Sequence, residues 1–317
     1  MGNHTVHTFD GSLNLNQLDP KYFSMGSALL NPVANPFFGY ITSSGCGLDQ
    51  PTVAQGQLLR PHPEFCDINE TDDPAGGSHY NALDVNYTHR VSQGLTLLAS
   101  YTFSKFIDDV GGPESWANTS GESIRNVYNL AAEKSVDATD TPHSFVLSYV
   151  YELPVGRGKQ FGSGMNGVAN QILGGWQTSG VLTLKQGFPL AISQPDSNPF
   201  GVGQHVNVVG DYHISNPSIS EWFNTSAFAA APQLTLGDAP RYFSDLRAPH
   251  YNNWDIGIQK NFPIVESTRL EFRLDMFNAF NHTNFYAPNT SLGAGSFGTI
   301  TSSWTPRLMQ AALRLYW

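Results

Sequence analysis

The chain has few charged residues, only two cysteines and no long apolar run. Charged side chains make up 13% of its 317 residues, about half of the roughly 25% that is usual for a soluble domain. A transmembrane helix needs about 18 or more consecutive apolar residues, and their absence excludes a helical membrane protein. The net charge of −10, with no cluster of Lys and Arg, argues against a nucleic-acid partner.

What replaces charge is a mixture of aromatic and small polar residues. Phe, Tyr and Trp reach 12% of the chain, and the mean hydropathy is still −0.25. Disordered chains are poor in aromatic residues, so this composition indicates a folded protein.

The two cysteines, Cys46 and Cys66, do not form a zinc pattern, which needs four closely spaced ligands. They form either a loop disulfide in an oxidising compartment or two unrelated thiols. Residues 1–7 have neither a basic nor an apolar region, so we expect no signal peptide in this chain. No motif points to an enzyme, and we expect no catalytic residue, no metal and no cofactor.

Four carboxylates lie together at Asp67, Glu70, Asp72 and Asp73. A calcium loop that started at Asp67 would need a glycine at its sixth place and a glutamate at its twelfth. Those places hold Asp72 and Ser78. The cluster therefore predicts a solvated loop.

From residue 80 the sequence alternates between apolar and polar residues, which is typical of strands. Leu83, Val85 and Tyr87 share one face, with Asp84 and Asn86 on the other. The predicted strands are residues 80–91, 95–107, 142–153, 174–186, 250–262, 268–281 and 307–317. Residues 1–79 are rich in Pro, Gly and Asn, and predict an irregular segment that resembles an external loop.

The lengths of strands and connections indicate a membrane barrel. Strands of soluble proteins average about 5 to 6 residues, whereas a tilted bilayer-spanning strand needs about 9 to 11. Short turns near residues 91–95 and 262–268 alternate with long connections at 108–141, 187–249 and 282–305. Outer-membrane barrels have short periplasmic turns and long external loops. We therefore predict an all-β fold, an antiparallel transmembrane β-barrel segment of residues 80–317.

Charged residues on the last strands fall on the polar face. A charge that faced lipid would cost roughly 2–4 kcal/mol for Arg or Lys near the midplane. We therefore expect these side chains to face the lumen and to make cross-strand contacts. They are Asp255, Glu271, Arg273, Asp275 and Arg314.

The last strand alternates strongly and ends on an aromatic residue. This pattern resembles the C-terminal signal that barrel-assembly machinery reads, with a plain amphipathic edge strand as the alternative. The signal residues are Met309, Ala311, Leu313, Leu315 and Trp317.

Several segments, taken in order, resemble the C-terminal barrel region of TonB-dependent receptors, and the Oar-like, acidobacterial type in particular. They are Tyr80–Tyr87 (YNALDVNY), Ala99–Asp108 (ASYTFSKFID), Thr141–Tyr149 (TPHSFVLSY), Tyr151–Lys159 (YELPVGRGK), Glu221–Phe228 (EWFNTSAF), Asn253–Phe262 (NWDIGIQKNF) and Arg269–His282 (RLEFRLDMFNAFNH).

The resemblance implies a barrel of about 22 strands, of which this chain holds about seven or eight. A plug and signal peptide are absent, so the chain is expected to be a C-terminal fragment. The implied partners are outer-membrane lipid, the barrel-assembly machinery, an imported ligand of unknown identity and, only through the missing N-terminal parts, the TonB system. The implied location is the cell outer membrane. The alternatives are a secreted soluble β-rich glycan-binding protein and a passive porin-like channel.

Overall fold

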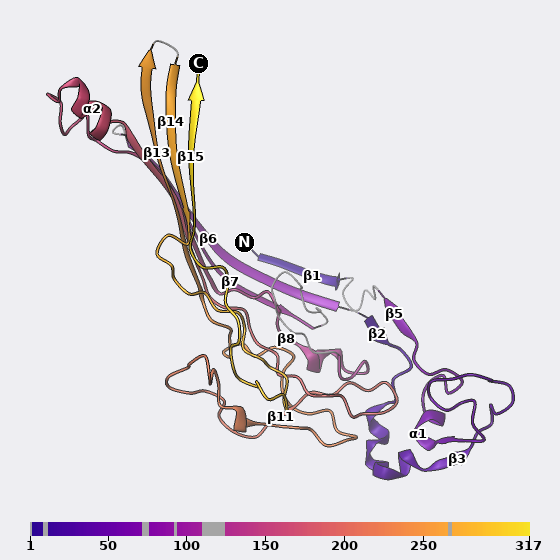
Figure 1. The fold of residues 1–317 in the computed structure, drawn as a ribbon. Helices are drawn as coiled ribbons and strands as arrows, with labels where there is room; N and C mark the ends of the chain where they lie inside the picture. The colour runs from indigo at the N-terminus through magenta and orange to yellow at the C-terminus, as the bar shows by residue number, and fades with distance from the viewer. Residues whose placement is uncertain (1, 9–11, 72–75, 92–93, 110–123, 266–267) are drawn as a thin grey trace.

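The computed structural model describes residues 2–8, 12–71, 76–91, 94–109, 124–265 and 268–317. Its main sheet has nine strands. Eight of them follow one another in the spatial order β1–β6–β7–β9–β10–β13–β14–β15, the ninth, β8 (Ser135–Val136), pairs with the end of β7, and every pair of neighbours is antiparallel (Figure 1). The all-β, antiparallel fold expected from the sequence is confirmed. The eight strands of this order are β1 (Gly2–Thr8), β6 (Gly76–Val91), β7 (Leu95–Asp108), β9 (His143–Glu152), β10 (Trp176–Lys185), β13 (Tyr251–Val265), β14 (Thr268–Phe277) and β15 (Leu308–Tyr316).

Seven of these strands, from β6 to β15, are 9 to 16 residues long. Their ends differ from the predicted strand ends by at most four residues. At about 3.3 Å per residue, each is long enough to cross the hydrocarbon part of a bilayer when tilted.

The prediction that residues 1–79 are irregular is wrong for β1. Gly2 pairs with Asn81 and His4 with His79, so β1 adds a strand to the outer edge of β6. Residues 2–8 contain a single apolar side chain, Val6, and therefore show no alternation. The pairing is made by backbone groups, which the side-chain pattern does not reveal.

Register separates the two faces of the sheet, because directly paired residues point the same way. One row across six neighbouring strands reads Leu97–Tyr149–Gly180–Ile256–Met276–Met309, and the next row reads Thr96–Val150–Ser179–Gly257–Asp275–Gln310. We call these the apolar face and the polar face. Gly180 lies beneath the ring of Tyr149, where a Cβ would come within 2.7 Å of a ring carbon.

The polar face also carries apolar residues, which a strict alternation of apolar and polar residues would not place there. Leu98 pairs with Ser148, Ser148 with Val181, and Val181 with Asp255. With Val150 and Phe277, these residues line an open hollow of about 430 Å³ on this face.

The sheet has two open edges among the described residues. β15 pairs only with β14, and β1 covers β6 only as far as Asn81. Residues 83–91 of β6 have no described strand on their outer side.

The two ends of the sheet differ (Figure 1). The C-terminus, the last residues of β13, the first residues of β14 and helix α2 (Gly167–Leu173) lie at one end, and the described long connections gather at the other. No described helix has the length and apolar character that crossing a membrane would require. The predicted turn at Ser92–Gln93 lies outside the described residues.

Within the described residues, the loops contain one 11-residue 3-10 helix, η1, and elements of two to four residues. These are β2 (Ser12–Asn14), η1 (Pro20–Leu30), β3 (Pro32–Ala34), β4 (Thr52–Ala54), α1 (Gln55–Leu58), β5 (Asn69–Thr71), η3 (Leu130–Glu133), β8 (Ser135–Val136), β11 (Asn207–Val208), η4 (Thr225–Ala227) and β12 (Phe228–Ala229). Three two-stranded sheets join β2 to β5, β3 to β4 and β11 to β12, and β8 extends the main sheet beside β7.

Candidate functional site in the loop assembly

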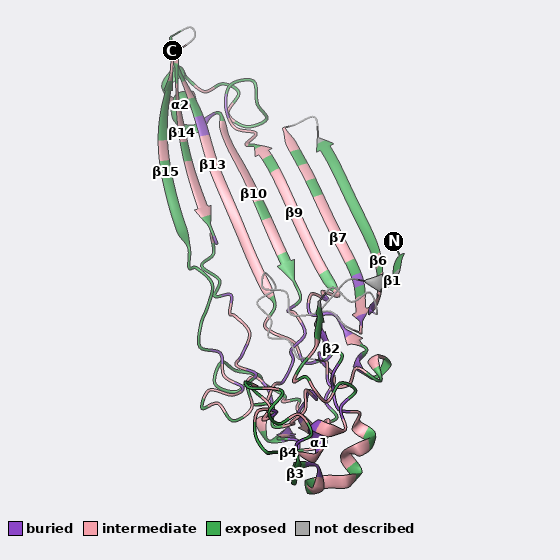
Figure 2. Cartoon of the chain, turned by 90° about the vertical axis from the view of Figure 1, so that its right-hand side faces the viewer, coloured by how far each residue is buried: buried purple, intermediate pink, exposed green. Residues whose placement is uncertain are grey.

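The buried core of the described chain lies in its loops and not in its sheet. We use the name loop assembly for residues 12–71, 124–142, 186–250 and 278–307. Every apolar side chain that is buried among the described residues belongs to these segments, and buried positions gather there in Figure 2. The long strands instead expose large apolar side chains, among them Leu83 at 60% and Leu313 at 67%. A contiguous exposed apolar surface of this kind marks an interaction with another apolar phase.

The largest apolar cluster of the loop assembly comes from residues 190–246. Phe223 is 1% exposed and lies edge-on to Phe228, with ring centroids 5.7 Å apart. Phe297, from the connection that precedes β15, meets Phe223 in the same manner at 5.3 Å. Two long loops that are distant in sequence therefore share one core.

A buried arginine, Arg241, joins the loop assembly to the sheet. Its side chain is 0% exposed, and its Nη2 donates to Asp108 Oδ1 at 2.5 Å, at the loop end of β7. Its Nε donates to the carbonyl of Glu133 at 2.9 Å. A buried charge is tolerated only when it is paired and hydrogen-bonded, and Arg241 meets both conditions.

Arg125 also contacts Glu133, and it joins this residue to the loop that contains Arg241. Its Nε lies 3.1 Å from Glu133 Oε1, and its Nη1 donates to the carbonyls of Gly237 and Ala239. Burial raises the pKa of Glu133, and the nearby Arg125 only partly offsets that increase.

Arg247 closes the loop assembly over the end of β9. Its Nη2 lies 2.5 Å from Asp140 Oδ2, and its Nη1 donates to the carbonyl of Gly187. The other oxygen of Asp140 accepts from the backbone nitrogen of Phe106 at 2.6 Å. These contacts fix where two loops leave the sheet.

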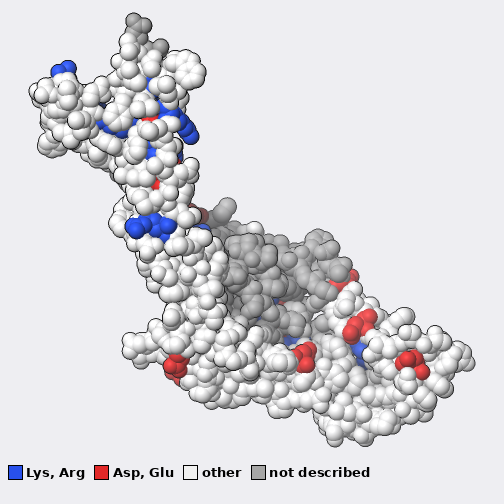
Figure 3. Space-filling model, viewed as in Figure 1, with Lys and Arg blue, Asp and Glu red and all other residues white. Residues whose placement is uncertain are grey.

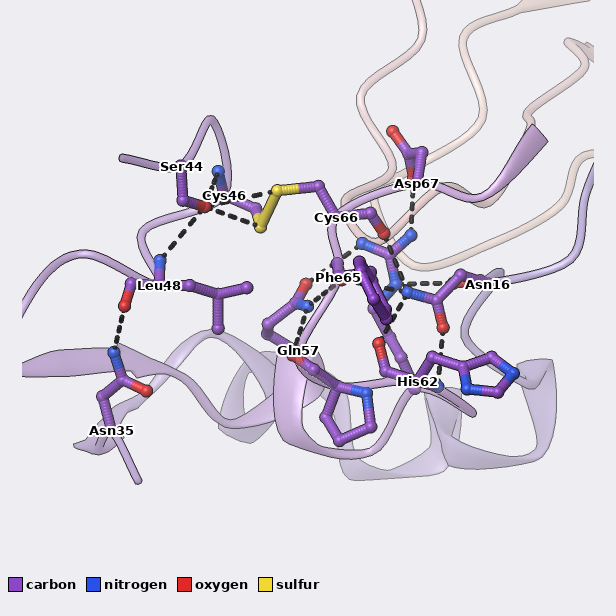
Figure 4. The surroundings of a disulfide bond; sticks show 12 residues. Asn16, Asn35, Ser44, Cys46, Leu48, Gln57, His62, Phe65, Cys66 and Asp67 are labelled. Atoms are coloured by element: carbon purple, nitrogen blue, oxygen red, sulfur yellow. Dashed lines mark hydrogen bonds and ion pairs between the residues drawn. A yellow bond between two sulfur atoms is a disulfide. The ribbon is translucent and has the colours of Figure 1, made fainter. Parts of the chain in front are cut away.

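The N-terminal part of the loop assembly is organised around a disulfide (Figure 4). Cys46 and Cys66, the possible pair, are bonded to each other. Ser44 Oγ lies 3.2 Å and 3.3 Å from the two sulfur atoms and accepts from the backbone nitrogen of Leu48. Asn16 donates to the carbonyl of Cys66, among others.

Asp67 of the predicted solvated acidic loop is about half exposed, with 51% of its side chain accessible, but it is also held by two partners. The Arg60 side chain is 2% exposed and lies 2.5 Å from Asp67, which also accepts from Asn14. Burial alone would raise the pKa of Asp67, but the hydrogen bonds from Arg60 and Asn14 outweigh burial and lower it. Asp72 and Asp73 lie outside the described residues.

The expected lumen-facing charges share the polar face but are only partly paired with one another. Arg314 Nη1 lies 3.9 Å from Glu271 Oε1, directly across β14 and β15. Arg273 instead contacts Asp275 along its own strand, at 2.8 Å. Asp255 has no charged partner among the described residues and accepts from the Asn253 side chain and the Asn278 backbone.

The residues of the expected assembly signal lie on the open-edged strand β15. Met309, Ala311 and Leu313 follow the apolar face in register with Met276, Leu274 and Phe272 of β14. Leu315 pairs with Leu270, and Trp317 follows the strand with 90% of its surface exposed.

Sequence patterns did not identify the arginines of the loop assembly as important residues. The one available signal was their isolation, because Arg241 and Arg247 are the only Lys or Arg residues between positions 186 and 259. In the view of Figure 3 the loop surface is mostly uncharged, with scattered acidic groups.

A family model described as an outer membrane beta barrel domain matches residues 1–310 of the chain. No curated protein and no solved structure matches it significantly.

Proposed function

The chain belongs to the family of outer membrane beta barrel domains, and we propose that it forms the C-terminal barrel part of an Oar-like, TonB-dependent receptor. Its place in the cell is the outer membrane, as the family implies. On this proposal the whole receptor binds a substrate at its external loops and imports it. The chain has no catalytic role in that process.

The ordered receptor-like segments carry this proposal. Tyr80–Tyr87 lies on β6, Ala99–Asp108 on β7 and Asn253–Phe262 on β13, and their order along the chain agrees with the order of strands in the sheet. A separation of long loops from short turns also agrees with a barrel that receives its substrate from one side.

The two faces of the sheet have distinct tasks in this scheme. The apolar face contacts lipid, and the polar face, with Glu271, Arg273 and Asp275, lines the lumen. Backbone groups in lipid must be paired internally, since each unsatisfied group costs several kcal/mol. Strands from outside this sequence therefore have to pair with the open edges at β6 and β15.

The TonB system acts, on this proposal, through parts of the receptor that this sequence does not contain. The decisive experiment deletes the gene in its source bacterium, deletes TonB in a second strain, and compares uptake across a panel of substrates. We expect loss of uptake of the same substrate in both strains. Uptake that survives the loss of TonB but not of the gene would instead establish the passive porin-like channel.

Recognition of β15 by the barrel-assembly machinery gives a second test. Deleting Trp317 from the full receptor should lower the amount that reaches the outer membrane severalfold, measured by heat-modifiable mobility. Replacing the exposed Tyr40 of the loop assembly with alanine is the control and should leave assembly unchanged. Equal assembly of both variants would show that the C-terminal aromatic is not part of the signal.

A further inference from the structure

A cavity of about 610 Å³ lies between two segments of the loop assembly. One wall is formed by residues 189–191, directly after β10, and the other by residues 286–291 with Ser302, before β15. Its volume falls within the roughly 300–1,000 Å³ of small-molecule sites.

The walls of the cavity are tied together by backbone hydrogen bonds. Ser193 donates its backbone N–H to the carbonyl of Thr290 at 3.0 Å, and Leu292 donates back to the carbonyl of Ser193 at 2.7 Å. Tyr286 donates its backbone N–H to the carbonyl of Ser302. Its ring stacks on Trp304, with centroids 4.8 Å apart. The position of Tyr286 is thus set before any ligand arrives, which lowers the entropic cost of binding.

The cavity is lined by hydroxyl, amide and apolar groups, with no charged side chain among its described lining residues. The hydroxyls of Tyr286 and Ser302 make no side-chain hydrogen bond within the described residues, so both are available to a ligand. Pro189 and Pro288 add apolar surface. A charged ligand would lose hydration here without gaining a counter-charge, which is costly.

We propose that this cavity binds a neutral oligosaccharide. Such a ligand presents many hydroxyls for Tyr286 and Ser302, and C–H faces for the prolines and the aromatic ring. This inference rests on the proposed function, since it names the substrate class that the external loops would accept. Charged ferric complexes and peptides with charged ends fit the uncharged lining less well.

The test measures binding to outer-membrane vesicles that carry the full receptor, using an array of neutral and acidic oligosaccharides. We expect retention of at least one neutral oligosaccharide and none of the acidic ones. Ser302→Trp, which fills the cavity, should weaken binding more than tenfold. Tyr286→Phe, which removes one hydroxyl, should weaken it about two- to tenfold, as the loss of one hydrogen bond does.

The matched control is Ser220→Trp, which places the same side chain at an exposed loop serine outside the cavity. It should bind as the unmodified receptor does. The inference is overturned if no neutral oligosaccharide binds, if an acidic one binds in preference, or if Ser302→Trp and Tyr286→Phe leave binding unchanged.

Vesicle binding requires no TonB, so the two proposals fail in different ways. Retained oligosaccharide with no TonB-dependent uptake would refute the receptor function alone. TonB-dependent uptake of another substrate class, with no oligosaccharide bound, would refute the cavity assignment alone.

Discussion

Removing the buried Arg241 should destabilise the loop assembly strongly while leaving the sheet intact. Arg241→Met keeps much of the side-chain volume but removes the hydrogen bonds to Asp108 and to the Glu133 carbonyl. A hydrogen bond to a charged group contributes about 1.5–3 kcal/mol and a neutral one about 0.5–1.5 kcal/mol. The Asp108 side chain, 6% exposed, is left without this partner, and breaking such a buried pair costs about 3–5 kcal/mol.

Proteolysis of outer-membrane vesicles that carry the protein measures this loss. Cleavage of a transiently opened region follows the population of its open form, and each 1.4 kcal/mol is about tenfold. We expect Arg241→Met to speed cleavage within residues 186–250 by about a hundredfold or more. The exposed Arg307 provides the control, since Arg307→Met should change the rate less than about twofold.

A double variant separates charge pairing from packing. Arg241→Met combined with Asp108→Leu removes both charges of the pair and should recover part of the lost protection, because the Asp108 carboxylate is then no longer buried without the Arg241 guanidinium. Equal cleavage rates in Arg241→Met and Arg307→Met would refute the reasoning, since they would show that the buried pair does not hold the loops.

Three further predictions concern other parts of the chain. Replacing Cys46 and Cys66 with serine should destabilise the N-terminal part of the loop assembly by about 3 kcal/mol, as a sequence separation of 20 residues predicts; unchanged protease protection would contradict this. The lowered pKa of Asp67 means that its contribution to stability is complete above the unfolded pKa of 3.8 and is lost as pH falls through the lower folded pKa. In Asp67→Asn, protease protection should therefore fall less steeply as the pH is lowered. An unchanged fall would show that other groups cause the loss of protection in acid. A Phe272→Cys variant labelled with a fluorophore should be quenched by lipid-soluble quenchers, and Arg273→Cys by water-soluble ones; the reverse pattern would invert the lumen and lipid faces.

The long strands could be predicted from sequence because each is long enough for alternation to be unambiguous. Leu270, Phe272 and Leu274 alternate with Glu271 and Arg273 along β14, so one strand alone shows its two faces. β1 could not be found in this way, because its place depends on a free backbone edge of β6. Likewise Val181 follows the polar face only because its register with Ser148 and Asp255 sets it there.

The loop assembly was beyond sequence patterns for a different reason. Its contacts join residues far apart in the chain: Arg241 lies 133 positions from Asp108, and Gln17 bonds to Arg125 across 108 positions. Contacts at such separation carry no local period, and the Pro- and Gly-rich segments that contain them resemble ordinary connections. The disulfide was expected as a possibility because two cysteines offer a single intramolecular pairing.

The long-range contacts of the loops bear on how such a protein enters its membrane. Residues 12–71, 124–142 and 186–250 all have to reach the far side of the bilayer before their shared contacts can form, since Gln17 bonds to Arg125 and Arg241 to the carbonyl of Glu133. Once Arg125, Arg241 and Arg247 have found their partners, drawing any loop back would require all of these contacts to open together. Folding of the loops on the far side of the membrane thus makes insertion of the protein effectively irreversible.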